Sequence, residues 1–333
     1  MIVVNYHDDL NEVQGGALAA LLVAPHALAP FDRLAWWQGL AEHCELTPLL
    51  AIASQGDDHA VLALQRDGGS LSALANWYSF RWRPLITPKA DTNALLTALA
   101  RDLAGHTARL TLAPLPDELG ETLQLETAFK AAGWTTFRTP CGVNHILPTN
   151  GRTSAEYLAA RPGPVRTTLK RKASKVAVTI ETAFNPASWA AYEAIYAESW
   201  KPGEGSPAFL RDFAQAEGVA GRLRLGLARA DGQPVAAQLW TVEHGTAYIH
   251  KLAHREAAKS LSPGTTLTAA LFKHVIDCDR IELVDFGTGD DGYKRDWMEQ
   301  VRPRYRLDCY LAAAPQNWAA IARQYLRRLA GRG

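Results

Sequence analysis

Apolar runs of strand length, separated by turn residues, occur in the same order in both halves of the chain. Three runs in each half, joined by turns rich in Asp and Gly, predict a three-stranded antiparallel meander. The two meanders lie roughly 175 positions apart, which we interpret as a weak internal duplication. The runs are 49–53, 60–64 and 71–75 in the first half, and 223–228, 235–242 and 247–253 in the second.

Helices are predicted around both meanders, from apolar residues at helical spacing and from end signals. The helix after the second meander has the clearest start, with Ser262 as N-cap and Pro263 at the first helical position. The other main helices are predicted over 91–105, 120–132 and 189–200. Additional strands are predicted at 110–112, 134–139, 143–147, 281–286 and 306–312.

Composition and charge describe an ordinary soluble protein of about two domains. The chain has 333 residues, of which 47% are hydrophobic and 21% charged. A net charge of +1 gives no overall case for nucleic-acid binding. The four cysteines lack any metal-ligand spacing, so we expect free thiols, a reducing compartment and no metal site. Because the N-terminus shows no signal-peptide pattern, we expect a cytoplasmic protein.

A basic segment at 161–175 carries six positive charges, and no acidic residue occurs between Glu156 and Glu181. One interpretation is a solvated helix face. The other is an anion site, because like charges repel one another unless something negative binds. A cofactor phosphate, an anionic lipid surface or an RNA backbone would each fit this segment.

The stretch 281–297 combines a buried strand pattern with polar side chains that have little reason to be buried. Gly287, Gly289 and Gly292 have the Gly-x-Gly-x-x-Gly spacing of dinucleotide-binding loops. However, Asp290 and Asp291 would repel a phosphate, and no apolar helix follows. The remaining interpretations are a Gly/Asp turn, a divalent-cation site and a substrate-facing loop, of which we favour the last.

Candidate catalytic residues lie in this stretch and on the strand before it. Strand alternation places Tyr248, His250, Leu252 and His254 on one face. Histidine is a natural general base near neutral pH, although a structural role for His250 is the competing interpretation. We predict His250 or Asp285 as the base, Tyr293 as an acid or orienting hydroxyl, and Lys294 as a partner for an anionic substrate group.

A resemblance to a known family rests on the pattern Asp-Phe-Gly-x-Gly-Asp-x-x-Tyr-Lys-x-x-Trp at 285–297. This pattern resembles the signature of acetyltransferase-like proteins near the Fem-type peptidyl transferases, including the bacterial cellulose-biosynthesis type. Those proteins belong to the GNAT (Gcn5-related N-acetyltransferase) superfamily. The resemblance implies an α/β fold (mixed α+β) of two tandem GNAT-like domains, each with a central mixed, mainly antiparallel sheet flanked by helices.

The resemblance also implies domain limits and an activity. We expect a degenerate N-terminal domain over 1–147, a catalytic domain over 148–312 and a basic amphipathic helix over 313–333. The implied enzyme is an N-acyltransferase. It would move an acyl group from acyl-coenzyme A to the amine of a lipid, such as a long-chain sphingoid-type base, or of a cell-envelope precursor.

Binding residues follow from the same resemblance. The start of the helix at 262–265 would receive the cofactor pyrophosphate, although an ordinary capped helix is the alternative and the usual glycine-rich phosphate loop is missing. The predicted cofactor contacts are Arg166, Lys170, Ser262, Gly264 and Thr265. The predicted substrate contacts are Asn76, Tyr78, Trp200, Lys201, Glu204, Asp290 and Asp291.

Two alternatives stay open from the sequence. A Fem-type transferase would take aminoacyl-tRNA as donor, which is the one case in which we expect a nucleic-acid partner. A non-catalytic scaffold of polysaccharide biosynthesis would have the fold without a cofactor. The basic amphipathic helix, with Arg323, Arg327, Arg328 and Arg332, adds an expectation of peripheral contact with the inner membrane.

Overall fold

The computed structural model describes residues 1–13, 16–23 and 28–331. Arg332 therefore lies outside the described residues. The chain divides into two compact units, which we describe separately. Unit 1 comprises 1–143 and 302–333, and unit 2 comprises 144–301. No helix among the described residues is long and apolar enough to cross a membrane.

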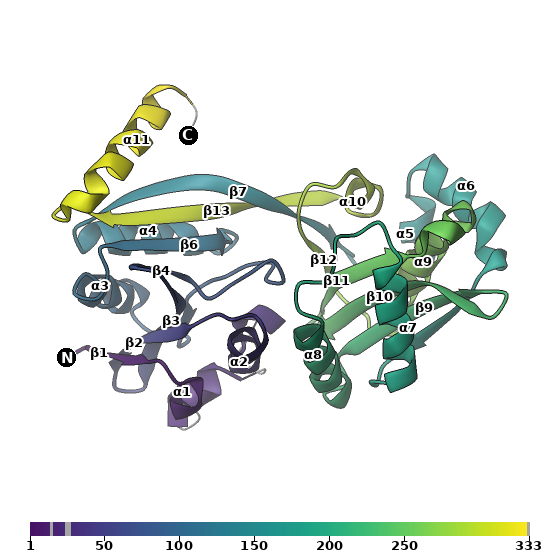
Figure 1. The fold of residues 1–333 in the computed structure, drawn as a ribbon, viewed down its shortest axis with the longest axis horizontal. Coiled ribbons are helices and arrows are strands. Elements are labelled where there is room, and N and C mark those ends of the chain that lie inside the picture. Colours follow the sequence, from purple (N-terminus) through teal and green to yellow (C-terminus); the bar gives the residue numbers. More distant parts are fainter. Residues whose placement is uncertain (14–15, 24–27, 332–333) are drawn as a thin grey trace. The chain divides into compact units, whose positions relative to one another are not determined.

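Unit 1 is a mainly antiparallel sheet with helices packed on it (Figure 1). The strand order is β1-β2-β3-β4-β6-β13-β7, with β5 beside β3. The strands are β1 (Val3–His7), β2 (Pro48–Gln55), β3 (Asp58–Asp67), β4 (Ser70–Ala73), β5 (Leu85–Ile86), β6 (Arg109–Leu115), the first part of β7 (Trp134–Pro148) and most of β13 (Gln300–Leu311). The helices are α1 (Gly16–Leu21), α2 (Leu34–His43), α3 (Thr92–Leu103), α4 (Glu121–Ala131) and α11 (Trp318–Leu329).

The first predicted meander is confirmed as β2, β3 and β4. Leu49 pairs with Leu64 and Leu64 with Ala73, so alternate apolar residues of the three strands face a common core. Leu96 and Leu99 of α3 are buried in the same core. The helix begins where the sequence predicts, because the Asp91 side chain accepts a hydrogen bond from the Ala94 amide at 3.0 Å.

In unit 2 the strand order continues from the second part of β7 as β7-β12-β11-β10-β9-β8, again with mainly antiparallel pairing. The remaining strands are β8 (Ala177–Glu181), β9 (Leu223–Ala230), β10 (Gln233–Glu243), β11 (Thr246–His254) and β12 (Leu283–Thr288). The helices are α5 (Ser154–Ala159), α6 (Gly163–Lys172), α7 (Pro186–Ala197), α8 (Pro207–Val219), α9 (Pro263–Asp277) and α10 (Gly292–Trp297). The second predicted meander is confirmed as β9, β10 and β11.

Helix α9 supplies the largest share of the unit 2 core. Leu267 and Leu271 are fully buried against Trp240 and Ile249 of the sheet. Gly226 of β9 makes this close approach possible, because a Cβ there would lie 2.9 Å from both leucine Cδ1 atoms. The glycine lets helix and sheet meet without a gap.

Several sequence predictions differ from the structure. The predicted strands at 134–139 and 143–147 form one long strand, β7. Residues 302–312, predicted within the second domain, cluster with unit 1 because β13 pairs with β6. Helix α8 was not predicted, although Ser206 caps it through the Phe209 amide at 3.4 Å. A short helix, α10, follows the glycine loop, where we predicted none.

Candidate functional site

Strands β11 and β12 run parallel for only three residue pairs and then separate. The pairs are Thr246 with Leu283, Ala247 with Val284, and Tyr248 with Asp285. Strand β11 continues to His254 and β12 to Thr288 without further pairing between them. The backbone edge of β11 beyond Tyr248 is therefore available to an extended ligand that carries amide groups.

A cavity of about 420 Å³ lies where the two strands separate. Its walls come from β10, β11, β12, the N-terminal turn of α9, the short helix α10 and the loop after α7. The lining residues are Trp200, Gln238, Leu252, His254, Glu256, Lys259, Ser262, Pro263, Gly264, Thr265, Thr268, Phe286, Tyr293 and Trp297. Five residues predicted from the sequence are thus brought together here: Trp200, Ser262, Gly264, Thr265 and Tyr293.

The N-terminus of α9 forms one wall of this cavity. Ser262 adopts a left-handed backbone conformation (φ +51°), and its side chain makes no capping bond. The Ser262 hydroxyl instead accepts a hydrogen bond from Lys172 Nζ at 3.0 Å. The first amides of a helix have no partner within the helix and attract anions, so this wall favours a negatively charged group.

The basic helix α6 contributes a different residue from those we predicted. Arg166 and Lys170 are exposed and do not line the cavity. Lys172, two positions later, is the side chain of this helix that reaches Ser262. The prediction that Arg166 and Lys170 contact the cofactor stays a prediction.

A bulge in β11 separates the residues that strand alternation placed together. Lys251 pairs with Leu239 and Ile249 with Trp240, so His250 is the extra residue of a bulge in the register of β11 against β10. His250 Nε2 lies 2.8 Å from the Thr241 hydroxyl, and its ring packs edge-on against Phe213 of α8. The prediction of one shared face is therefore wrong: Leu252 and His254 line the cavity, and His250 does not.

His254 is the histidine of the cavity. Its ring lies 4.4 Å from the Trp200 ring, and its Nδ1 is 3.9 Å from where a Cβ on Gly264 would sit. Burial lowers the pKa of His254, while Glu256 opposes this shift. Nε2 is buried and makes no hydrogen bond within the described residues. A neutral imidazole with an available ring nitrogen can accept a proton.

Tyr293 lies on α10 with 36% of its surface exposed. Burial raises the pKa of Tyr293 to about 12, and the nearby carboxylate of Asp291 adds to the shift. The phenol therefore keeps its proton at neutral pH. A protonated phenol at the cavity wall can donate a hydrogen bond or a proton to a developing negative charge.

Asp285 and Lys294 hold the loop that leads to Tyr293. Asp285 accepts from Asn144 Nδ2 at 3.2 and 3.1 Å and from the Gly287 amide at 2.8 Å. Lys294 is 4% exposed and donates to the Gly287 carbonyl at 3.4 Å and to the Thr288 carbonyl. Burial lowers the pKa of Lys294 to about 8, against the opposing effect of Asp291. Neither side chain lines the cavity.

The two loop aspartates differ in their contacts. Asp290 accepts from Arg295 at 2.6 Å, and its other oxygen lies 2.9 Å from the buried His145 Nε2. Hydrogen bonds from Arg295 and then His145 lower the pKa of Asp290. Asp291 is exposed. Burial, with the nearby charge of Lys251, lowers the pKa of Lys201, and the charge of Asp291 opposes this shift. No group of three or more His, Cys, Asp or Glu side chains in the described part of the chain could hold a metal ion.

The predicted acceptor loop contacts two cavities. Trp200 lines the cavity described above, and Lys201 lines a second cavity of about 480 Å³ between α7 and α8. Glu204 lines the second cavity and accepts from Lys251 at 3.0 Å. The second cavity is lined by Trp189, Tyr192, Glu193, Tyr196, Ala197, Lys201, Gly203, Glu204, Pro207 and Leu210.

Asn76 and Tyr78 belong to unit 1. The Asn76 side-chain oxygen accepts from the Tyr78 amide at 3.0 Å, which shapes the turn. Tyr78 is buried, and its ring lies 5.5 Å from that of the exposed Trp77. Their predicted contribution to substrate binding stays a prediction.

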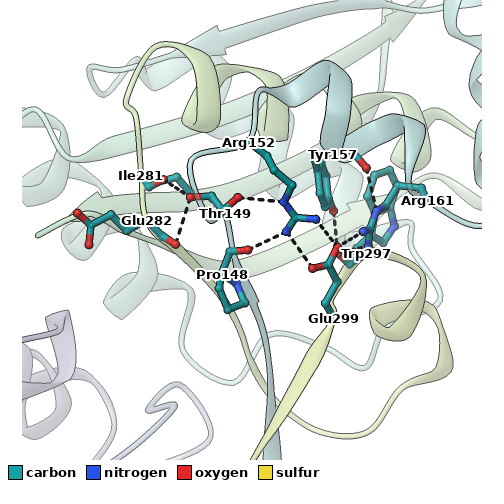
Figure 2. Close-up of polar contacts among 9 residues, drawn as sticks. All are labelled: Pro148, Thr149, Arg152, Tyr157, Arg161, Ile281, Glu282, Trp297 and Glu299. Atoms are coloured by element: carbon teal, nitrogen blue, oxygen red, sulfur yellow. Dashed lines mark hydrogen bonds and ion pairs between the residues drawn. The ribbon is translucent and has the colours of Figure 1, made fainter.

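A polar network fixes the segment that follows Tyr293 (Figure 2). Arg152 donates twice to the Glu299 carboxylate, at 2.9 Å for each bond, and Arg161 also donates to Glu299. The Trp297 carbonyl accepts from Tyr157 Oη at 2.7 Å and from Arg161 at 3.0 Å. These bonds anchor the end of α10 to Tyr157 of α5 and to Arg161, which lies two positions beyond the end of α5. They thereby set the position of the cavity wall.

A family model and several solved structures are similar to this chain. Residues 156–295 match the family model described as acetyltransferase (GNAT) domain. This match contains β11, β12, the start of α9 and all but the end of α10. No curated protein sequence matched the chain.

Solved structures resemble the chain over most of its length. The C-terminal domain (DUF2156) of a putative lysylphosphatidylglycerol synthetase from Agrobacterium fabrum is 16% identical, with 87% of this chain and 90% of that chain covered and a TM-score of 0.58. FemX is 11% identical, with 95% and 100% covered and a TM-score of 0.63. A tandem GNAT protein from the clavulanic acid biosynthesis pathway is 14% identical, with 92% and 98% covered and a TM-score of 0.53. The predicted tandem GNAT-like fold is confirmed.

Proposed function

Residues 156–295 of this chain are related to the acetyltransferase (GNAT) domain family, and from that premise we propose that the protein is an acyl-coenzyme A-dependent N-acyltransferase. The observation that carries this proposal is the cavity at the separation of β11 and β12, with the N-terminus of α9 as one wall. The family match and the fold support a transferase. The choice of donor and acceptor is our inference.

Acyl-coenzyme A fits this cavity in three respects. Its pyrophosphate matches the open amides of α9 and the ammonium groups of Lys172 and Lys259. Its pantetheine arm carries two amides and can pair with the open edge of β11. Gly264 has no side chain to keep the ligand from the α9 backbone.

The reaction requires one net proton movement, from the attacking amine to the sulfur. The amine nitrogen attacks the thioester carbonyl, the C–S bond breaks, and the thiolate takes a proton. Tyr293 keeps its proton at neutral pH and can donate a hydrogen bond or the proton to the sulfur. For the base we favour His254 over His250 and Asp285, because His254 lines the cavity.

The acceptor amine would approach from the loop that contains Trp200 and Lys201. Aromatic and aliphatic side chains, among them Trp189, Tyr192 and Leu210, line the second cavity beside this loop. Such a surface suits the apolar part of a lipid or cell-envelope amine. Lys201 and Glu204 would contact polar groups of the acceptor, as would Asp290 and Asp291 from the loop after β12.

A second donor, aminoacyl-tRNA, is the alternative that the Fem-type resemblance implies. The fold likeness to FemX and the exposed basic residues of α6, namely Arg166, Lys170 and Arg171, favour this alternative. Phosphate contacts to RNA need exposed arginine and lysine side chains of this kind. The donor experiment must therefore separate the two classes.

A thermal-shift titration tests the proposal. Coenzyme A, acetyl-coenzyme A and palmitoyl-coenzyme A are each added to nuclease-treated protein, with a detergent control for the long-chain thioester. A ligand of the folded state adds about 2.7 kcal/mol of stability at 100 times its dissociation constant. We expect stabilisation in wild type and in Lys170→Ala, and a smaller shift in Lys172→Ala. No shift with any thioester, together with activity that depends on added tRNA, would establish the alternative donor.

A further inference from the structure

Helix α11 exposes most of its apolar residues to solvent, whereas its arginines line a hollow against the sheet of unit 1. Trp318, Leu326 and Leu329 are 60%, 66% and 84% exposed, and Tyr325 is 51% exposed. With Ala322, these residues form one continuous stripe, because 318, 322, 326 and 329 are three or four positions apart. Ordinary surface helices of globular proteins have the opposite arrangement.

Helix α11 comes after β13 in the chain and extends away from the sheet of unit 1 (Figure 1). Trp318 Nε1 donates to the Ala312 carbonyl at 2.8 Å. Arg328 lies over the Phe137 ring at 4.7 Å, and Tyr325 meets the same ring edge-on at 5.2 Å. No residue of α11 is buried. Core packing therefore does not account for the apolar stripe.

An arginine-rich hollow of about 480 Å³ lies between α11 and the strands β6, β7 and β13. Asp308 is the one acidic residue among the described residues that line it. This aspartate is already bound by Arg306 at 3.0 Å and by Thr111 at 2.8 Å. The lining residues are Arg109, Thr139, Arg306, Asp308, Tyr310, Ala320, Arg323, Gln324, Arg327 and Arg328.

The positive charge of this hollow is largely uncompensated. Arg323 and Arg327 make no ion pair within the described part of the chain, and no acidic residue follows Asp308 in the sequence. Arg109 is exposed, and its guanidinium group lies over the Tyr310 ring at 5.4 Å. Several guanidinium groups around one hollow match the oxygens of a phosphate group.

We propose that α11 and this hollow form a docking face for a bilayer that contains anionic phospholipid. The apolar stripe enters the boundary between head groups and acyl chains, and the arginine-rich hollow binds a lipid phosphate beside it. The phosphates of an RNA backbone would also match the arginines, but RNA binding would not explain the exposed stripe of Trp and Leu side chains. The proposal is independent of the donor site in unit 2.

Vesicle co-sedimentation tests the proposal with the full-length chain. Vesicles of phosphatidylcholine alone are compared with vesicles that also contain phosphatidylglycerol, at low and high salt. Two double variants remove one feature each: Arg323→Gln with Arg327→Gln, and Leu326→Gln with Leu329→Gln. Glutamine keeps a high helix propensity. Arg101→Gln with Lys130→Gln, on exposed positions of α3 and α4, is the matched control.

Wild type should bind the anionic vesicles and not the neutral ones, and more weakly at high salt. Loss of the two arginines should weaken binding about 20- to 30-fold, since each basic residue near an anionic surface contributes roughly a fivefold factor. The leucine variant should also bind more weakly, and the control should match wild type. Melting curves of all variants should coincide.

Four results would each overturn the proposal. Equal binding to neutral and anionic vesicles would remove the role of the hollow. Unchanged binding of the leucine variant would remove the role of the stripe. Absence of vesicle binding, together with arginine-dependent binding of bulk tRNA, would identify a nucleic-acid surface instead. Concentration-dependent dimerisation that the leucine variant abolishes would assign the stripe to a second copy of the chain.

Discussion

Replacement of Glu299 by glutamine should destabilise unit 2 and disturb the cavity wall at a distance. Glu299 accepts from both Arg152 and Arg161, and the Arg161 side chain is 5% exposed (Figure 2). Glutamine keeps the shape and one acceptor oxygen but removes the negative charge. Arg161 would then be a buried cation without its carboxylate partner.

The expected loss follows from the burial of the two partners. Removal of one partner from a fully buried ion pair costs about 3–5 kcal/mol, whereas an exposed pair contributes about 0–1 kcal/mol. Glu299 is 32% exposed, so solvent screens part of the interaction. We therefore expect a loss of about 2 kcal/mol, which corresponds to a fall in Tm of roughly 4–8 °C for a domain of this size.

The pH dependence of this loss is a second signature. Hydrogen bonds from Arg152 lower the pKa of Glu299 below its ordinary value of 4.5. A carboxylate with a lowered folded-state pKa contributes its full stabilisation above the unfolded-state pKa, and this is lost as pH falls through the folded-state pKa. The difference between wild type and Glu299→Gln should be constant from pH 6 to 8 and should shrink below about pH 4.5.

Urea unfolding monitored by tryptophan fluorescence measures this difference. Lys273→Gln is the control, because it removes an exposed pair on α9 with Asp277, in which Lys273 is 70% exposed. The control should lose no more than about 0.5 kcal/mol. If Glu299→Gln is as stable as the control at neutral pH, the network does not anchor α10 and our reasoning is refuted.

Three further predictions concern the cavity and its loop. Tyr293→Phe should lower kcat about 100-fold or more with little change in KM, because loss of a general acid acts on the transition state; an unchanged kcat would exclude that role. In the pH profile of kcat/KM, we expect an acidic limb below pH 6.5, because burial lowers the pKa of His254. His254→Asn should abolish this limb, whereas His250→Asn should preserve it. Burial lowers the pKa of Lys294 from 10.5 to about 8, so between pH 8 and 10.5 the unfolded state binds more protons at this residue than the folded state does. The free energy of unfolding of wild type, relative to that of Lys294→Met, should therefore rise with pH across this range. Parallel stability curves for the two proteins would contradict the last prediction.

Much of the fold could be predicted because it depends on local patterns. The alternation in both meanders specified the strands and turns, and the glycine-rich stretch at 285–297 indicated the GNAT superfamily, which the family match confirms for most of this region. Helix α8 could also have been found, because Ser206 and Pro207 are ordinary start signals. Helix α10, with six residues, is too short for periodicity to reveal it.

The site was less predictable because it depends on three-dimensional contacts. The bulge at His250 shifts the alternation of β11 by one residue, and this exchanged His250 for His254 in the cavity. Similarly, the choice of Lys172 over Lys170 depends on how α6 lies against the start of α9. The loop residues Asp285 and Lys294 had the polar character of a site, but their observed bonds are to other parts of the loop and to Asn144.

Titration calorimetry with coenzyme A on wild type and Gly264→Val tests the central claim most directly. A Cβ at Gly264 meets only His254 Nδ1, at 3.9 Å, so the variant should fold, while its side chain enters the space of the ligand beside α9. The account predicts that one coenzyme A binds per wild-type chain and that Gly264→Val, with an unchanged Tm, binds at least tenfold more weakly, a difference of about 1.4 kcal/mol. Equal binding by both proteins, or no binding by wild type, would contradict the assignment of this cavity as the donor site.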